Sequence, residues 1–139
     1  MISITGTYEH NMDAKGRLFV PAKLREDLGP ICYLTLGVDN CLAIHPQESW
    51  DRFAEKAAAL PMGQSKHLRA FFANAMRVEP DSQGRIVIPQ FLREYAGLMK
   101  EVIIIGANTR AEIWDAGRWQ AAQEAMTENL TALMESLEV

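Results

Sequence analysis

A short motif with the order Asp-x-x-Gly-Arg occurs twice in this chain and carries its best candidates for binding chemistry. The first copy consists of Asp13, Gly16 and Arg17, and the second consists of Asp81, Gly84 and Arg85. An exposed Arg is the commonest specific reader of guanine, because its guanidinium donates to O6 and N7 in the major groove. The motif therefore predicts DNA-contacting turns, with the alternative that each Arg only pairs with the Asp of its own turn.

The first copy is the better candidate for contact with DNA because it carries more positive charge. Lys15 lies within the first turn, where the second turn has Gln83. Lys23 follows that turn, where the second copy has Phe91. Lys23 and Arg25 are placed to touch phosphates, which adds affinity without sequence information; the alternative is that both lie on a solvated helix face. The predicted DNA-binding residues are Lys15, Arg17, Lys23, Arg25 and, as an ancillary contact or a structural residue, Arg85.

Each turn has to be held by a strand before it, a strand after it and a short helix. The glycine of each turn suits a tight hairpin, where a positive φ costs glycine little, and the Asp can accept hydrogen bonds from the turn amides. Pro21 and Pro89 suit the first position of a helix, and Gly29 and Gly97 suit the position after its end. This order predicts strand, turn, strand and a helix of about two turns in each copy.

The internal similarity extends beyond the turns to most of the chain. Trp50 and Trp119, for example, occupy equivalent places in the two copies. A repeat of this length indicates one supersecondary unit used twice. Each half alone is near the size at which a core becomes marginal, so we expect the halves to share one core. The predicted divisions are a first module at 5–47, a helical connection at 48–75, a second module at 76–119 and a C-terminal helix at 120–139.

The last part of the chain has the pattern of one long amphipathic helix between Arg118 and Glu138. Such a helix is long for a small protein, so its apolar stripe is expected to face another subunit. The stripe consists of Trp119, Ala122, Met126, Leu130, Leu133 and Leu137.

Charge is distributed unevenly along the chain. The formal net charge of −4 argues by itself against nucleic acid as a partner. Basic residues outnumber acidic ones between Gln64 and Lys100, whereas acidic residues dominate beyond Ala111. Segregated charge allows a basic face on an acidic protein, and phosphates respond to that local face.

Other kinds of site find little support in the sequence. His10, His45 and His67 are scattered without ligand spacing, no nucleophile elbow or phosphate loop is present, and neither a catalytic site, a metal site nor a cofactor is expected. Cys32 and Cys41 are expected to be reduced and partly buried. No apolar run reaches the roughly 18 residues that span a bilayer, and no secretory signal is evident. These features predict a cytoplasmic protein without a membrane partner.

The ordered set of motifs resembles the MraZ family, in which two tandem modules similar to those of the AbrB and SpoVT transition-state regulators lie in one chain. The resemblance covers nearly the whole chain and is highly specific because many motifs occur in the right order. The matching segments are Tyr8–His10, Asp13–Arg17, Pro21–Arg25, Asp81–Arg85, Arg93–Leu98, Lys100–Val102 and Glu112–Trp114.

The resemblance implies both a fold and a function. The implied fold is α+β with a mainly β core, in which two AbrB-like modules form a pseudo-twofold swapped-hairpin β-barrel flanked by helices. The implied function is a nucleoid-associated transcriptional regulator, mainly a repressor, of the division and cell wall gene cluster. Such proteins bind G-rich direct repeats of double-stranded DNA in their own promoter as ring-shaped homo-oligomers, and the DNA-contacting residues would be Arg17 with Lys15 beside it.

Two alternatives of other classes were weighed on the sequence. An AbrB-type antitoxin would bind a toxin protein through its C-terminal segment, and a disordered tail would favour it over the helical stripe seen here. A small hydrolase using Asp13 or Asp81 with a His would need a paired base, which the sequence lacks. A non-enzymatic DNA-binding protein is therefore the sequence-based prediction.

Overall fold

The computed structural model describes residues 2–138, and its two halves contain the same series of elements. The first half consists of β1 (Thr7–Asn11), β2 (Arg17–Phe19), α1 (Ala22–Leu28), β3 (Cys32–Leu36), β4 (Leu42–Pro46) and α2 (Gln47–Ala58). The second consists of β5 (Met76–Arg77), β6 (Arg85–Val87), α5 (Gln90–Ala96), β7 (Glu101–Gly106), β8 (Ala111–Asp115) and α6 (Ala116–Thr127). Between them lie α3 (Met62–Ser65), the 3-10 helix η1 (Lys66–Leu68) and α4 (Arg69–Ala73), and α7 (Leu130–Ser136) follows the second half.

Proline and glycine set the limits of the two short helices, as the sequence predicts. Pro21 and Pro89 stand one position before the first helical residue, in extended conformation, and their carbonyls accept the first helical hydrogen bonds. Gly29 and Gly97 follow the last helical residues with positive φ. The only difference from the expectation is that the prolines cap the helices instead of starting them.

The strands of the two halves pair with each other. β1 pairs antiparallel with β7, so that Thr7 faces Ile105, and β5 pairs with β3, so that Arg77 faces Tyr33. β4 and β8 join the two pairs into a six-stranded sheet of order β1-β7-β8-β4-β3-β5. β2 and β6, one from each half, form a separate two-stranded ribbon. The pairing therefore exchanges strands between the repeats.

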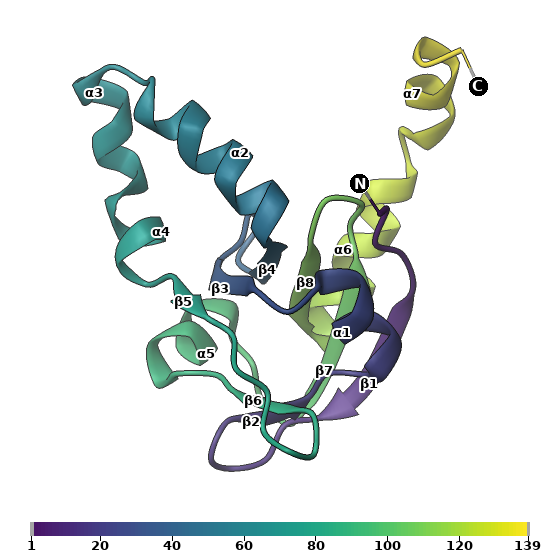
Figure 1. Ribbon diagram of the computed structural model, residues 1–139. Helices are drawn as coiled ribbons and strands as arrows, with labels where there is room; N and C mark the ends of the chain where they lie inside the picture. The colour runs from purple at the N-terminus through teal and green to yellow at the C-terminus, as the bar shows by residue number, and fades with distance from the viewer. Residues whose placement is uncertain (1, 139) are drawn as a thin grey trace.

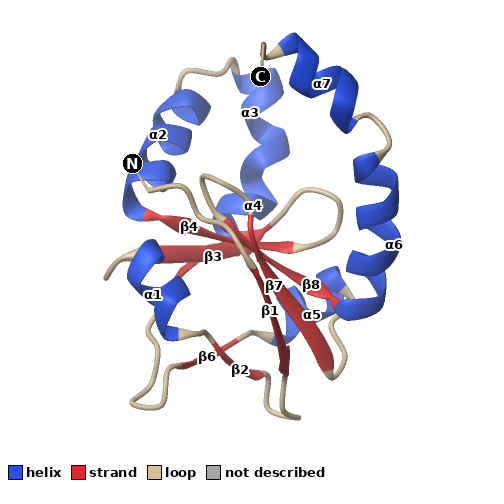
Figure 2. Ribbon diagram, turned by 90° about the vertical axis from the view of Figure 1, so that its right-hand side faces the viewer, coloured by secondary structure: helices blue, strands red, loops and turns tan. Residues whose placement is uncertain are grey.

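The sheet lies between two layers. The β2–β6 ribbon with α1 and α5 covers one face, and α2, α4 and α6 lie on the other (Figures 1 and 2). A single core fills the space between the ribbon and the sheet, which confirms the expectation that the halves share one. Its fully buried side chains come from both halves and include Leu18, Leu24, Leu34, Ile44, Ile88, Leu92, Ile104 and Ile113.

The α+β class predicted from the sequence is confirmed, with a mainly antiparallel sheet. A closed barrel is not formed by the strands of residues 2–138, because β1 and β5 are the two edges of the larger sheet and the ribbon does not hydrogen-bond to it. Closure would require ladder contacts between the ribbon and both edges, whereas β2 and β6 pair only with each other.

The C-terminal segment differs from the single long helix that was predicted. Asp115 caps α6 by accepting a hydrogen bond from Arg118 N, α6 ends at Thr127, and α7 begins only at Leu130. Asn129 precedes α7, and Asn is a poor residue for a helix interior. Only the start of α6 is packed on the sheet, where Trp119 contacts Trp114. The stripe beyond it, including Leu130, Leu133 and Leu137, is exposed.

The connection between the halves forms a helical arm, residues 47–73, that rises from the sheet (Figure 1). Trp50 stacks on Tyr33 of β3, with ring centroids 4.7 Å apart, and on Phe71 of α4 at 5.7 Å. These aromatic contacts hold the returning helix α4 against α2 and the sheet. Across residues 2–138, no helix has the length and apolar character needed to cross a membrane.

Candidate nucleic-acid interface

The first turn is organised by the carboxylate of Asp13. Its Oδ1 accepts hydrogen bonds from the backbone N–H groups of Lys15 and Arg17, at 3.0 and 2.9 Å, and its Oδ2 accepts one from Arg17 Nε. Gly16 completes the turn with a φ of 81° and donates to the Asp13 carbonyl. The guanidinium of Arg17 is thus held by one nitrogen, and its two terminal amino groups form no hydrogen bond within residues 2–138.

The second turn repeats this geometry. Asp81 Oδ1 accepts from the backbone N–H groups of Gln83 and Arg85, at 2.8 and 2.9 Å, and Oδ2 accepts from Arg85 Nε at 3.0 Å. In both turns the pKa of the Asp is lowered, mainly by the backbone hydrogen bond from the Arg, with smaller contributions from the Arg side chain and from the second turn amide. The carboxylates therefore stay ionised and keep the arginines in place at neutral pH.

Hydrogen bonds between the halves place the two turns side by side. Val20 N donates to the Gly84 carbonyl at 2.9 Å, and Ile88 N donates to the Gly16 carbonyl at 2.8 Å. Both turns project at one end of the molecule, beyond the β2–β6 ribbon, and the arm and α7 rise at the other end (Figure 1). The two motifs of the sequence thus meet in one surface.

Two further arginines brace these turns from the opposite half. Arg25 donates from Nε to the Val20 carbonyl, and its guanidinium carbon lies 3.1 Å from where a Cβ on Gly84 would be. Arg93 lies equally close to Gly16 of the first turn, and its buried Nε has no hydrogen-bond partner in the described part of the chain. Arg25 therefore lies against the second turn, although its sequence position associates it with the first.

The two lysines predicted to contact DNA differ in their distance from the paired turns. Lys15 lies on the first turn, is exposed, and forms no side-chain hydrogen bond within the described residues. Lys23 lies on the outside of α1, where its Nζ is 2.9 Å from Asp27 Oδ1, and this hydrogen bond raises the pKa of the lysine. No hydrogen bond or ion pair within residues 2–138 joins Lys23 to either turn.

The assembled surface has a surplus of positive charge despite the acidic composition of the chain. The two turns and their bracing residues contribute five cationic side chains and two carboxylates. The cationic residues are Lys15, Arg17, Arg25, Arg85 and Arg93. A protruding, basic, pre-ordered β-ribbon end of this kind fits the edge of a nucleic-acid groove better than a flat surface does.

The cysteines and the possible metal ligands of the described residues do not form a reactive site. Cys32 and Cys41 are free and buried, and burial raises the pKa of the thiols to about 11 and about 12, so they are poor nucleophiles at neutral pH. No group of three or more His, Cys, Asp or Glu side chains suited to a metal ion occurs in the part of the chain that the structure describes.

Comparison with known proteins identifies the family. The sequence pattern of the family described as "MraZ protein, putative antitoxin-like" matches residues 3–68 and again residues 71–137. The two matches coincide with the two halves that exchange strands. The chain belongs to the MraZ family. The resemblance inferred from the paired motifs is thereby confirmed.

Several MraZ relatives resemble the chain over most of its length. The "Transcriptional regulator MraZ" of Acetivibrio thermocellus is 51% identical over 120 residues, which cover 84% of this chain and 83% of the relative. The proteins of the same name from Carboxydothermus hydrogenoformans and Heliobacterium modesticaldum are 46% and 45% identical, covering 90% and 95% of this chain and 94% of each relative. MraZ relatives are thus named as regulators and not as enzymes, in agreement with the sequence-based prediction of a non-enzymatic protein.

Proposed function

We propose that this chain is a cytoplasmic, nucleoid-associated transcriptional regulator that binds double-stranded DNA through the turn containing Lys15 and Arg17. One observation carries the proposal: Asp13 engages only Nε of the Arg17 guanidinium, which leaves the two terminal amino groups available. These are the groups that can donate together to O6 and N7 of guanine. The side chain is already ordered in the free protein, so little rotamer entropy is lost on binding.

The other candidate residues have supporting roles in this proposal. Arg85 has the same geometry as Arg17 but lacks a neighbouring lysine, since Gln83 stands in the place of Lys15, and it serves as an ancillary contact. Arg25 adds charge beside the second turn, and Lys23 contacts phosphates from the outside of α1. Asp13, Gly16, Asp81 and Gly84 are the structural residues that shape the turns.

The proposed target is a set of G-rich direct repeats in the promoter of the protein's own operon, within the division and cell wall gene cluster, where binding mainly represses transcription. A single turn reads too few base pairs to find one promoter. A ring-shaped homo-oligomer would present many identical turns to repeats of matching spacing, and linked weak contacts gain affinity through effective concentration. Membership of a family whose relatives are named transcriptional regulators supports this target class.

The strand exchange supports a more specific description of the fold. In a swapped-hairpin β-barrel, the hairpin of each AbrB-like module crosses to the strands of the other module. The pairings of β1 with β7, β5 with β3, and β2 with β6 have this pattern. We propose that the chain is a swapped-hairpin unit in which the ribbon, sheet edges and short helices enclose one core.

Binding to repeats of altered spacing tests the proposed mode of recognition. Fluorescence anisotropy would compare a duplex carrying G-rich direct repeats, a duplex in which the same repeats are separated by irregular spacers, and a scrambled duplex, each at several salt concentrations. Tight binding only to regular repeats is expected, because the turns of one assembly have fixed separations. Equal affinity for all three duplexes would contradict sequence-specific recognition.

An AbrB-type antitoxin remains the alternative, because α7 presents an exposed apolar stripe that a toxin protein could cover. Limited proteolysis of the free protein separates the two functions. Rapid loss of the segment after Thr127, with protection only in a stable complex with a toxin protein, would favour the antitoxin. A tail that resists cleavage in the protein alone would favour the DNA-binding regulator.

A further inference from the structure

A groove lies where the helical arm meets the sheet, and no function has yet been given to it. It encloses about 610 Å³, a volume within the range of sites that hold small molecules. Its walls come from α2, η1 and α4 of the arm and from β3 and β4 of the sheet, and the turn between β7 and β8 completes its lining. We call it the arm groove; its lining includes Leu36, His45, Ser49, Phe53, Leu68 and Arg110.

Apolar side chains form the middle of the arm groove. Phe53 of α2 and Phe71 of α4 both line it, with ring centroids 5.0 Å apart. Leu36 of β3 and Leu68 of η1 add aliphatic surface, and all four side chains are only partly buried in this chain. A ligand with an apolar body would remove this surface from water, which is favourable.

Hydrogen-bonding groups without partners lie at the start of α2. Ser49 is only 9% exposed, and its buried hydroxyl oxygen has no hydrogen-bond partner in the described part of the chain. Such a group costs free energy until a partner is supplied. Burial, together with the charge of Arg110, lowers the pKa of His45 to about 4, so its imidazole is uncharged at neutral pH and can donate one N–H. That ring forms no hydrogen bond within residues 2–138.

The charged side chains of the arm groove are all cationic. Arg110 is fixed by Glu112, whose Oε2 accepts from Nε at 3.1 Å and from Nη2 at 2.8 Å, and Nη1 forms no hydrogen bond within residues 2–138. Lys56 is exposed and has no ion-pair partner among the described residues. No carboxylate of the described chain belongs to the lining, so the groove favours an anion.

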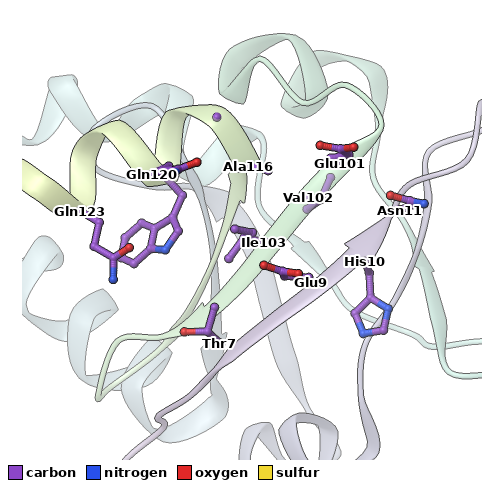
Figure 3. A pocket seen from close by; sticks show the side chains of 12 residues that line it. Thr7, Glu9, His10, Asn11, Glu101, Val102, Ile103, Ala116, Gln120 and Gln123 are labelled. Atoms are coloured by element: carbon purple, nitrogen blue, oxygen red, sulfur yellow. The ribbon is translucent and has the colours of Figure 1, made fainter.

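The groove beside α6 shows that this charge is not a general property of the sheet face. Figure 3 shows Glu9 and Glu101 on the strands of that groove and Gln120 and Gln123 on α6. Its lining contains no Lys or Arg of residues 2–138. The two grooves of the same face therefore favour ligands of opposite charge.

We propose that the arm groove binds a small amphiphilic carboxylate, with the chemistry of a medium-chain fatty acid. Nη1 of Arg110 and the donors of His45 and Ser49 receive the carboxylate, and the apolar chain covers Phe53 and Leu68. An inorganic anion would leave the apolar lining in water, and an uncharged hydrocarbon would leave the Ser49 hydroxyl without a partner. Both properties of the ligand are thus specified by the lining. The site lies apart from the paired turns and does not rest on the proposed function.

Isothermal titration calorimetry of the full chain without DNA tests the site with three probes below their micelle-forming concentrations. Decanoate carries both features, decyltrimethylammonium has the same chain with the opposite charge, and acetate has the charge without the chain. We expect saturable binding of one decanoate per chain. Affinity for the other two probes should be at least about tenfold lower, because a charge-assisted hydrogen bond or the apolar contact is missing.

Variants locate the binding within the arm groove. Arg110→Gln should weaken decanoate binding about tenfold or more, whereas Arg110→Lys, which keeps a cation beside Glu112, should retain most of it. Ala70→Phe introduces a large side chain at an exposed lining position of α4 and should obstruct the groove without changing its charge. Circular dichroism would verify folding, and Ala70→Phe decides the question if Arg110→Gln does not fold. The matched control is Lys100→Gln, which removes an exposed cation outside the groove and should bind as the wild type does.

Three results would overturn the proposal. They are the absence of saturable decanoate binding by the wild type, equal affinity for decyltrimethylammonium, and wild-type affinity in a folded Ala70→Phe variant. The first is the result expected if a neighbouring copy covers the groove, and the second is expected of nonspecific adsorption to apolar surface. DNA is absent throughout, so either outcome leaves the role of Arg17 to be judged by its own experiment.

Discussion

At the scale of single residues, each Asp-Arg pair shapes its turn and still leaves guanidinium atoms free for the proposed contact with DNA. Asp13 and Asp81 each engage one guanidinium nitrogen together with two backbone amides. The pair is therefore a structural element of the turn, and it also orients the remaining amino groups of Arg17 and Arg85. Reading and shaping the turn are compatible because they use different atoms of the same side chain.

The glycines of the two turns provide a matched test of this geometry. Both have a φ of 81°, but a Cβ on Gly16 would lie 2.7 Å from the backbone oxygen of Ile88, whereas the atoms nearest to one on Gly84 belong to the side chains of Phe19 and Arg25, at 3.0 Å or more. A side chain can move aside and the backbone cannot. We expect Gly16→Ala to lower the free energy of unfolding by about 2–3 kcal/mol and Gly84→Ala by about 1 kcal/mol.

Urea denaturation of the two glycine variants beside the wild type measures this difference. Their order is the informative quantity, since both substitutions place Ala at the same φ. Equal losses, or a larger loss for Gly84→Ala, would contradict the close backbone approach at the first turn.

At the scale of elements, the helical arm depends on a neutral histidine. The ring of His45 lies 5.9 Å from that of Trp50 and 6.2 Å from that of Phe71, which joins the sheet to α2 and α4. Burial, together with the charge of Arg110, lowers the pKa of His45 to about 4. The folded state therefore resists protonation at a pH where the unfolded chain, with a pKa of about 6.5, accepts a proton.

This difference predicts a pH dependence of stability with a defined sign. Between about pH 6.5 and pH 4 the unfolded state binds the extra proton, so stability is lost as the pH falls, by up to about 1.4 kcal/mol per pH unit. His45→Phe should remove this slope while keeping the ring contacts, and His67→Gln, which removes an exposed imidazole, should retain it. Denaturant titrations at several pH values would decide, and an unchanged slope in His45→Phe would contradict the assignment.

The sequence predicted the helices and turns correctly where proline or glycine marks their ends. The hairpin turns and the helices after Pro21 and Pro89 follow from residues within the segment itself. The sequence analysis predicted one C-terminal helix and missed the break between α6 and α7. A stripe of apolar residues indicates which side of a helix is apolar, but it does not show whether another element packs there and keeps the helix continuous. Likewise, the return of α4 onto Trp50 depends on aromatic contacts between distant residues.

The candidate site was predictable at its centre and not at its borders. Arg17 and Lys15 lie on the exposed turn as expected, because the motif itself forms the turn. Arg25 lies against the opposite turn, and Arg93 braces the first turn, because the strands cross between halves. The sequence of one repeat does not indicate whether a side chain will contact its own repeat or the other one. The occurrence of Arg at equivalent positions, 25 and 93, did indicate that these two residues have the same role.

At the scale of the whole molecule, strand exchange makes each repeat incomplete alone. β1 has its partner β7 in the other half, and β5 has its partner β3 there. Fragments 1–75 and 76–139, produced separately, are expected to be unfolded by circular dichroism and to gain native structure when mixed. Independent folding of either fragment, with no change on mixing, would contradict the shared core.

Comparison of Arg17→Ala with Arg85→Ala tests whether the first turn contacts guanine in DNA. Both substitutions remove an Arg held by an Asp in the same geometry, so each is the structural control for the other. Fluorescence anisotropy with G-rich direct repeats would measure affinity, and light scattering would verify an unchanged assembly. Arg17→Ala should lose about 1–3 kcal/mol, roughly 5- to 150-fold per contacted site, and Arg85→Ala distinctly less. Wild-type affinity in Arg17→Ala would contradict this role and leave the first turn as a structural hairpin.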